Sequence, residues 1–158
     1  MPYQLPQDWP PGPPDVVIDL ATRQLVPSDD PEYLAWVAAG NTVQPAAPLT
    51  PDQEFSKRLT VGGLAITSTS APALNGVYRV DVMSQQRITA VYVGIKGGDG
   101  LPGNGATFSY LDMTGVPHSF TADQFVAFAK AVRDYVYALT MAAMQPSPVW
   151  PSNEVEIP

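Results

Sequence analysis

The alternation of apolar and polar residues along the middle of the chain predicts two pairs of short strands. Residues 64–68 and 77–82 are rich in β-branched and aromatic side chains, and each run follows a glycine. Residues 107–111 and 116–120 have the same character and flank the turn 112–115, which ends in glycine. We therefore expect two short β-hairpins.

Two longer segments follow the spacing of an amphipathic helix. Ser84 can cap the first, whose stripe is formed by Ile88, Val91, Tyr92 and Ile95. The β-branched content of this segment leaves a strand as the alternative. Thr121 and Gln124 form a capping box at the start of the second. Its apolar stripe comprises Phe125, Phe128, Ala129, Val132, Val136 and Leu139. We expect this second helix to be the main core helix.

The N-terminal third contains weaker signals. Residues 15–20 and 24–26 are strand-like and could pair. A helix is predicted over about 29–39, because Ser28 or Asp29 can cap it and Pro31 suits its first turn. A second capping signal at 50–53 opens a short helix that continues to about Leu59.

Proline is concentrated at the ends of the chain and sets the expected domain organisation. Eleven of the 18 prolines precede Asp52, and six of them lie within residues 1–14. Dense proline favours extended segments over helix interiors and central strands. The sequence therefore predicts a small single α+β domain over 51–145, flanked by an extended N-terminal arm (1–50, with one short helix) and an extended C-terminal tail (146–158).

Composition excludes several classes of function. The formal charge is −7 and the eight lysines and arginines are scattered, which argues against nucleic-acid binding. The chain has no cysteine, so disulfides and thiolate chemistry are excluded. No apolar run approaches the ~20 residues needed to span a bilayer, and the first residues lack the pattern of a secretory signal. We expect a protein that is not inserted in a membrane and that is made in the cytoplasm.

Few residues suggest catalysis or cofactor binding. His118 is the only histidine, and we expect it to face solvent on its strand. Ser119 and Asp112 could join it in a small hydrolase, although neighbouring strand residues point to opposite faces. The glycine loop at 97–105 lacks the lysine of a phosphate loop and the carboxylates of a calcium loop. We therefore predict no catalytic, cofactor-binding or metal-binding residues and no enzymatic activity.

Large aromatic side chains in the proline-rich ends are the candidates for contacts with other proteins. They are Tyr3, Trp9, Trp36 and Trp150. Such residues dominate interface energetics when they fill a partner's pocket. The alternative is that the ends fold back and bury them on the same chain.

Several motifs resemble a known family. They are Ser84-Gln85-Gln86-Arg87-Ile88, Tyr110, Gly115 and Thr121-Ala122-Asp123-Gln124-Phe125, within residues 64–142. In this order they resemble an uncharacterised domain of tail-fibre, tail-assembly and baseplate-region proteins of tailed bacteriophages and prophages. Residues 33–42 are similar to a segment near the N-terminus of phage tail proteins.

The resemblance implies a structural role in a phage tail. The expected partners are other tail or tail-fibre proteins, with a homo-oligomer as a further possibility. The implied location is the virion, after assembly in the cytoplasm of the bacterial host. A tail-fibre assembly chaperone absent from the mature virion is the alternative.

Overall fold

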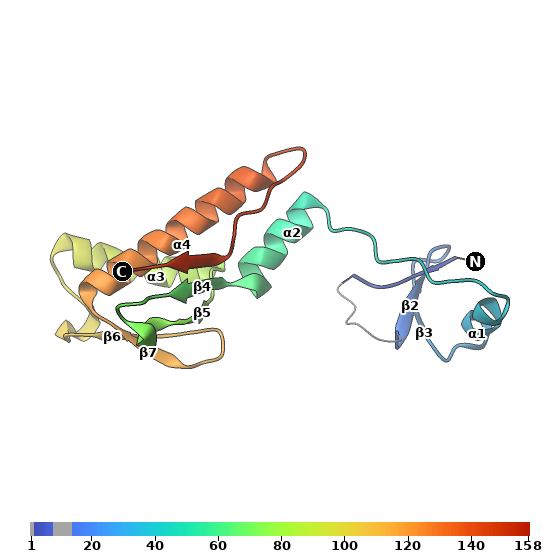
Figure 1. Cartoon of the computed structure of the whole chain (residues 1–158), viewed down its shortest axis with the longest axis horizontal. Coiled ribbons are helices and arrows are strands. Elements are labelled where there is room, and N and C mark those ends of the chain that lie inside the picture. The colour runs from blue at the N-terminus through green and yellow to red at the C-terminus, as the bar shows by residue number, and fades with distance from the viewer. Residues whose placement is uncertain (1, 8–13) are drawn as a thin grey trace. The chain divides into compact units, whose positions relative to one another are not determined.

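The chain folds as two units, Met1–Thr50 and Pro51–Pro158, each around its own apolar core. The computed structural model describes residues 2–7 and 14–158. Short strands and helices occur in both units (Figure 1), which confirms the predicted α+β class.

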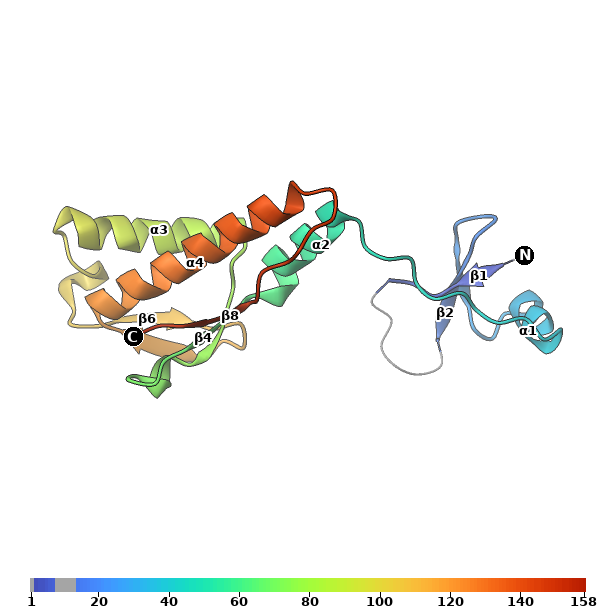
Figure 2. The ribbon, with the colours of Figure 1, turned by 45° about the horizontal axis from the view of Figure 1, so that its top comes forward.

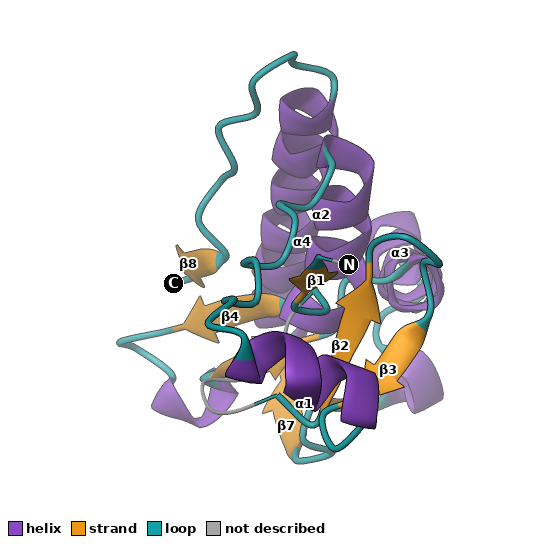
Figure 3. Cartoon of the chain, turned by 90° about the vertical axis from the view of Figure 1, so that its right-hand side faces the viewer, coloured by secondary structure: helices purple, strands orange, loops and turns teal. Residues whose placement is uncertain are grey.

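The N-terminal unit contains a small antiparallel sheet and one helix. Its strands are β1 (Tyr3–Gln4), β2 (Val16–Asp19) and β3 (Leu25–Pro27), in the order β1-β2-β3, followed by α1 (Pro31–Ala38). The hairpin of β2 and β3 (Figure 3) is the one predicted from the sequence. The predicted helix is also present, but Asp30 caps it by accepting hydrogen bonds from the Glu32 and Tyr33 amides.

The sequence predicts an extended arm here, whereas the structure has a folded unit. Tyr3, Val17 and Tyr33 are buried together, and Trp36 packs against them. The Tyr3 ring meets Tyr33 and Trp36 edge to face at centroid distances of 5.1 and 5.0 Å. An aromatic cluster therefore joins Tyr3 to residues 30 and 33 positions later in the chain.

The C-terminal unit is built on a three-stranded sheet. The strands are β4 (Leu64–Thr67), β5 (Gly76–Tyr78) and β8 (Glu154–Glu156), in the order β5-β4-β8. The pairing of β4 with β5 is antiparallel, as predicted. The C-terminal tail adds β8 to the other edge of β4 in parallel orientation (Figure 1), and the Ile157 amide donates to the Thr67 carbonyl at 2.8 Å. Ile157 is buried, so the tail belongs to the fold of this unit.

Helices and a separate two-stranded hairpin complete this unit. The helices are α2 (Pro51–Lys57, continued as a π-helical turn, Arg58–Gly62), α3 (Val82–Gly97) and α4 (Ala122–Ala143), and the hairpin consists of β6 (Phe108–Leu111) and β7 (Pro117–Phe120). Helices α3 and α4 lie side by side (Figure 2). Within the described residues, no helix combines the length and apolar character required to cross a bilayer.

Local signals placed α4 and its buried face correctly. The capping box of Thr121 and Gln124 is formed, with hydrogen bonds of 2.9 and 3.4 Å. Most of the predicted apolar stripe is buried, with Phe125, Phe128 and Leu139 fully buried. Their rings and methyl groups contact Leu64, Tyr78 and Phe120 in the main core.

The segment for which we expect a helix, with a strand as the alternative, is helical, as α3. Its cap is Asp81 and not Ser84: the Asp81 carboxylate accepts from the Ser84 amide at 2.8 Å. Asp81 is the penultimate residue of the predicted strand 77–82, and β5 already ends at Tyr78, so the strand is shorter than expected. Ile88 is buried in the core, and Val91, Tyr92 and Ile95 pack against it.

Candidate functional site

A cleft of about 410 Å³ lies between the first turns of α3 and the β6–β7 hairpin. This volume is in the range of about 300–1,000 Å³ that is typical of ligand pockets. The residues that give it chemical character are Arg79, Ser84, Arg87, Tyr110, Asp112 and Met113. We name it the arginine cleft.

The start of α3 forms one wall of the arginine cleft. Asp81 fixes the first turn of the helix, and Ser84 and Arg87 are three positions apart, so that they occupy the same face. The Gln85 side chain donates to the Val80 carbonyl at 2.7 Å and ties the helix to the preceding segment. Arg79 lies in this short segment between β5 and α3 and therefore enters the same cleft.

The β6–β7 turn forms the opposite wall and is held by many hydrogen bonds. Oδ1 of Asp112 accepts from the Thr114 amide, the Thr114 hydroxyl and the Val116 amide, at 2.8, 2.8 and 2.9 Å. The Met113 amide donates to the Val77 carbonyl at 2.7 Å, which joins the turn to β5. The wall is therefore a fixed part of the fold.

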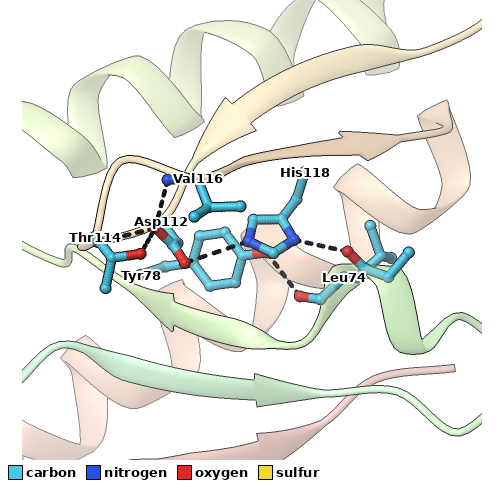
Figure 4. A network of polar contacts seen from close by, with 7 residues as sticks. Leu74, Tyr78, Asp112, Thr114, Val116 and His118 are labelled. Atoms are coloured by element: carbon cyan, nitrogen blue, oxygen red, sulfur yellow. Dashed lines mark hydrogen bonds and ion pairs between the residues drawn. The ribbon is translucent and has the colours of Figure 1, made fainter.

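The other oxygen of Asp112 faces His118 beneath the turn (Figure 4). Nε2 of His118 lies 3.3 Å from Oδ2 of Asp112, and Nδ1 lies 2.6 Å from the Ala73 carbonyl. The Tyr78 hydroxyl in the same network donates to the Leu74 carbonyl at 2.6 Å. His118 is only 9% exposed, so the prediction of a solvent-facing histidine is wrong. The strand alternates, and His118 shares the inward face of β7 with Phe120.

The geometry does not assemble a serine hydrolase site. Both ring nitrogens of His118 already face oxygen atoms of Ala73 and Asp112. Ser119 is exposed on the other face of β7, where its hydroxyl faces that of Ser109 at 3.4 Å. The pair of Asp112 and His118 therefore holds the hairpin to the β4–β5 connection. Among the residues that the structure describes, no three His, Cys, Asp or Glu side chains gather where they could hold a metal ion.

The ionisation of Asp112 gives a prediction for stability against pH. Burial opposes ionisation, but hydrogen bonds from Thr114, Val116 and His118 outweigh it and lower the pKa of Asp112 from 3.8 to about 2. Because the folded-state pKa is the lower one, the stabilisation is fully present above pH 3.8 and is lost as pH falls towards 2. Asp112→Asn should therefore be less stable than the parent chain at pH 5, and the difference should shrink by pH 2. Urea unfolding across this range measures it.

The control for this prediction is Asp99→Asn, because Asp99 is exposed in the glycine loop. We expect this substitution to leave the unfolding midpoint nearly unchanged at each pH. A constant difference between Asp112→Asn and the parent chain from pH 5 to 2 would contradict the proposed role of the carboxylate charge.

The two arginines of the cleft differ from the other guanidinium groups of this unit. Arg58 pairs with Glu54 and Arg133 with Asp134, each at 2.7 Å. Arg79 and Arg87 are exposed, and in the part of the chain that the structure describes neither has a carboxylate within 4.0 Å. Burial raises the pKa of Tyr110, while a hydrogen bond to Ser84 and the positive charge of Arg87 oppose this rise. The cleft therefore combines two available cations with hydroxyl groups.

The aromatic candidates for protein contacts lie elsewhere. Tyr3 is 4% exposed and Trp36 is half-buried beside it, so both serve the core of the N-terminal unit. Trp150 is half-buried against the core of the C-terminal unit, and the Arg58 guanidinium lies 5.4 Å from its ring centroid. Trp9 lies outside the described residues. The three described side chains thus pack mainly within their own units.

A second hollow follows the seam between α3 and α4 and is a weaker candidate. It measures about 170 Å³ and is lined mainly by the apolar parts of Ile88, Tyr92 and Ala129, with Lys130 and Arg133 at its edge. It lacks the set of converging polar groups that fixes the orientation of a ligand. The arginine cleft therefore has the stronger claim.

Sequence reasoning missed the arginine cleft as a site. Arg87 is part of a polar helix face by its position, and Arg79 lies inside the predicted strand 77–82. The sequence contained one signal for this site: two arginines, eight residues apart, lie on either side of the helix cap Asp81. Their convergence depends on the turn that β5 makes into α3.

A known protein family matches the C-terminal unit, which contains the arginine cleft. Residues 52–145 match the domain of unknown function DUF4376. No curated protein and no solved structure matches the chain. The matched range contains the arginine cleft, the hairpin and the helices α3 and α4, and it spans more than half of the 158 residues. The chain therefore belongs to the DUF4376 family.

Proposed function

We propose that this protein is a non-enzymatic component of the tail or baseplate region of a tailed bacteriophage and acts by protein–protein contacts. The observation that carries the proposal is the arginine cleft. Arg87, Tyr110 and Gly115 belong to the motifs that resemble phage tail proteins, and all three line this cleft. Motifs far apart in the sequence thus meet on one open surface.

The chemistry of the cleft suits recognition of another protein. Arginine is enriched at interfaces and is frequent among the residues that dominate binding energy. Among the described residues, Arg79 and Arg87 have no carboxylate partner, while the walls beside them are fixed by the capping of α3 and by the Asp112 turn. A rigid surface of this kind loses little conformational entropy when a partner binds.

Mass spectrometry of purified phage particles tests this proposal. If the protein is a tail component, tryptic peptides that end at Arg87 and Lys130 should be present in amounts comparable to those of other tail proteins. Peptides from an abundant host protein measure contamination. Absence from particles together with abundance in the infected lysate would overturn the structural role and support the assembly chaperone.

A further inference from the structure

We infer that the arginine cleft binds a carboxylate group on an acidic segment of a partner protein. The inference rests on the proposed function in one respect, since it takes the ligand to be a protein. It adds the binding site, the chemical class of the group that is bound and the residues that recognise it.

The charges that line the cleft favour a single negative charge. Arg79 and Arg87 supply two positive charges and Asp112 supplies one negative charge. The Asp112 charge is directed into its own turn, because Oδ1 accepts from Thr114 and Val116 and Oδ2 faces His118. One carboxylate balances the remaining charge of the lining residues, whereas a phosphate dianion would leave an excess of negative charge beside Asp112 and near Asp81, whose charge acts on Tyr110.

The hydrogen-bond donors of the cleft suit a carboxylate as well. A guanidinium group presents donors in a fork that matches two carboxylate oxygens. The hydroxyls of Ser109 and Tyr110 line the same cleft and can donate further. The cleft therefore offers more hydrogen-bond donors than one carboxylate needs. The residues next to the carboxylate in the ligand can then decide which donors it uses.

Apolar side chains beside the arginines indicate a peptide as the carrier of the carboxylate. Leu111 is 56% exposed and borders the cleft together with Met113. Exposed apolar surface at the edge of a charged site can pack against the aliphatic part of a side chain or its neighbours. A small inorganic anion would leave this surface and most of the about 410 Å³ unused.

Nuclear magnetic resonance titration of the ¹⁵N-labelled full chain tests the inference. The probes are a capped tripeptide with one central glutamate flanked by leucines, its glutamine counterpart and inorganic phosphate. We expect the glutamate peptide to cause saturable shifts at the amides of Ser84, Arg87 and Gly115. Binding of the glutamine peptide should be about ten-fold weaker or more, because a charge-assisted hydrogen bond is lost. Affinity should fall as salt is raised.

Matched variants locate the site. R79Q and R87Q should each weaken binding of the glutamate peptide by about ten-fold. R133Q is the control, since Arg133 is exposed on α4 outside the cleft, and it should leave the affinity unchanged. Amide spectra of the variants show that they remain folded. Equal binding of both peptides, tighter binding of phosphate, or loss of affinity in R133Q alone would overturn the inference.

The two experiments separate this inference from the proposed function. Peptide binding by a chain that is absent from phage particles would retain the carboxylate site and overturn the structural role in the tail. Presence in particles without saturable peptide shifts would retain the structural role and overturn the carboxylate site.

Discussion

Replacing Phe128 with alanine is expected to destabilise the C-terminal unit by about 3 to 5 kcal/mol, the usual cost of removing a buried phenyl ring. Phe128 is fully buried in the second turn of α4. Its ring lies 4.9 Å from that of Tyr78, 5.2 Å from that of Phe120 and 5.5 Å from that of Phe125, measured between centroids. The substitution would open a cavity where the helix, β5 and β7 meet. Urea unfolding followed by circular dichroism at 222 nm measures the effect.

Two further variants give this experiment its controls. Tyr137→Ala removes an aromatic ring from the same helix at a position that is 65% exposed, and we expect a change within about 0.5 kcal/mol. Phe128→Leu retains most of the apolar volume and should cost less than alanine. Similar losses for Phe128→Ala and Tyr137→Ala would contradict the placement of the core on this face of α4.

The elements that could be predicted from the sequence are those specified by near neighbours. The capping box of Thr121 and Gln124 closes within three residues, and the 3.6-residue period that follows identifies the buried face of α4. The turn at 112–115 likewise contains its own signal, because Asp112 binds the amides of residues two and four positions later. Neither element needs a distant partner for its identity.

Two wrong predictions, the cap of α3 and the direction of His118, could have been avoided from nearby residues. Asp81 is as good a helix cap as Ser84, but the β-branched and apolar residues around it favoured a continued strand. His118 and Phe120 are two positions apart on β7, so the burial of one predicts the inward direction of the other. A polar side chain on an inward face then needs partners, which Ala73 and Asp112 provide.

The remaining features depend on residues far apart in the chain. Tyr3 is buried because Tyr33 and Trp36 cover it, and nothing near Tyr3 in the sequence indicates this. In the tail, Glu154 and Glu156 alternate with the apolar residues Val155 and Ile157, which is the pattern of a strand. The strand with which this segment pairs, β4, lies almost ninety residues earlier. Arg79 and Arg87 form one site only because the chain brings the start of α3 opposite the β6–β7 hairpin. Such convergence is a property of the tertiary structure, and the spacing of residues alone does not contain it.

Gly63→Ala should destabilise the C-terminal unit by about 2 to 5 kcal/mol, because backbone strain and overpacking act together. Gly63 has φ 66° and ψ −177°, a conformation that is essentially restricted to glycine. An added Cβ would meet Sδ of Met113, Cγ1 of Val77 at 2.8 Å and the Tyr78 carbonyl oxygen at 3.0 Å. The methionine can move, but the carbonyl belongs to β5 and is held by its pairing with β4. Urea unfolding measures the loss.

Gly98→Ala separates the two causes of this loss. Gly98 has φ 92° at the end of α3, and an added Cβ would have nothing within 4 Å, so only the backbone cost of about 1 kcal/mol should remain. Equal losses at Gly63 and Gly98 would show that the close packing around Gly63 has no energetic effect.

Met113 also lines the arginine cleft. If the methionine moves to admit the new Cβ, Gly63→Ala should in addition weaken binding of the glutamate peptide, whereas Gly98→Ala should leave it unchanged. Gly63, immediately before β4, would then be required both for the stability of the sheet and for the shape of the cleft.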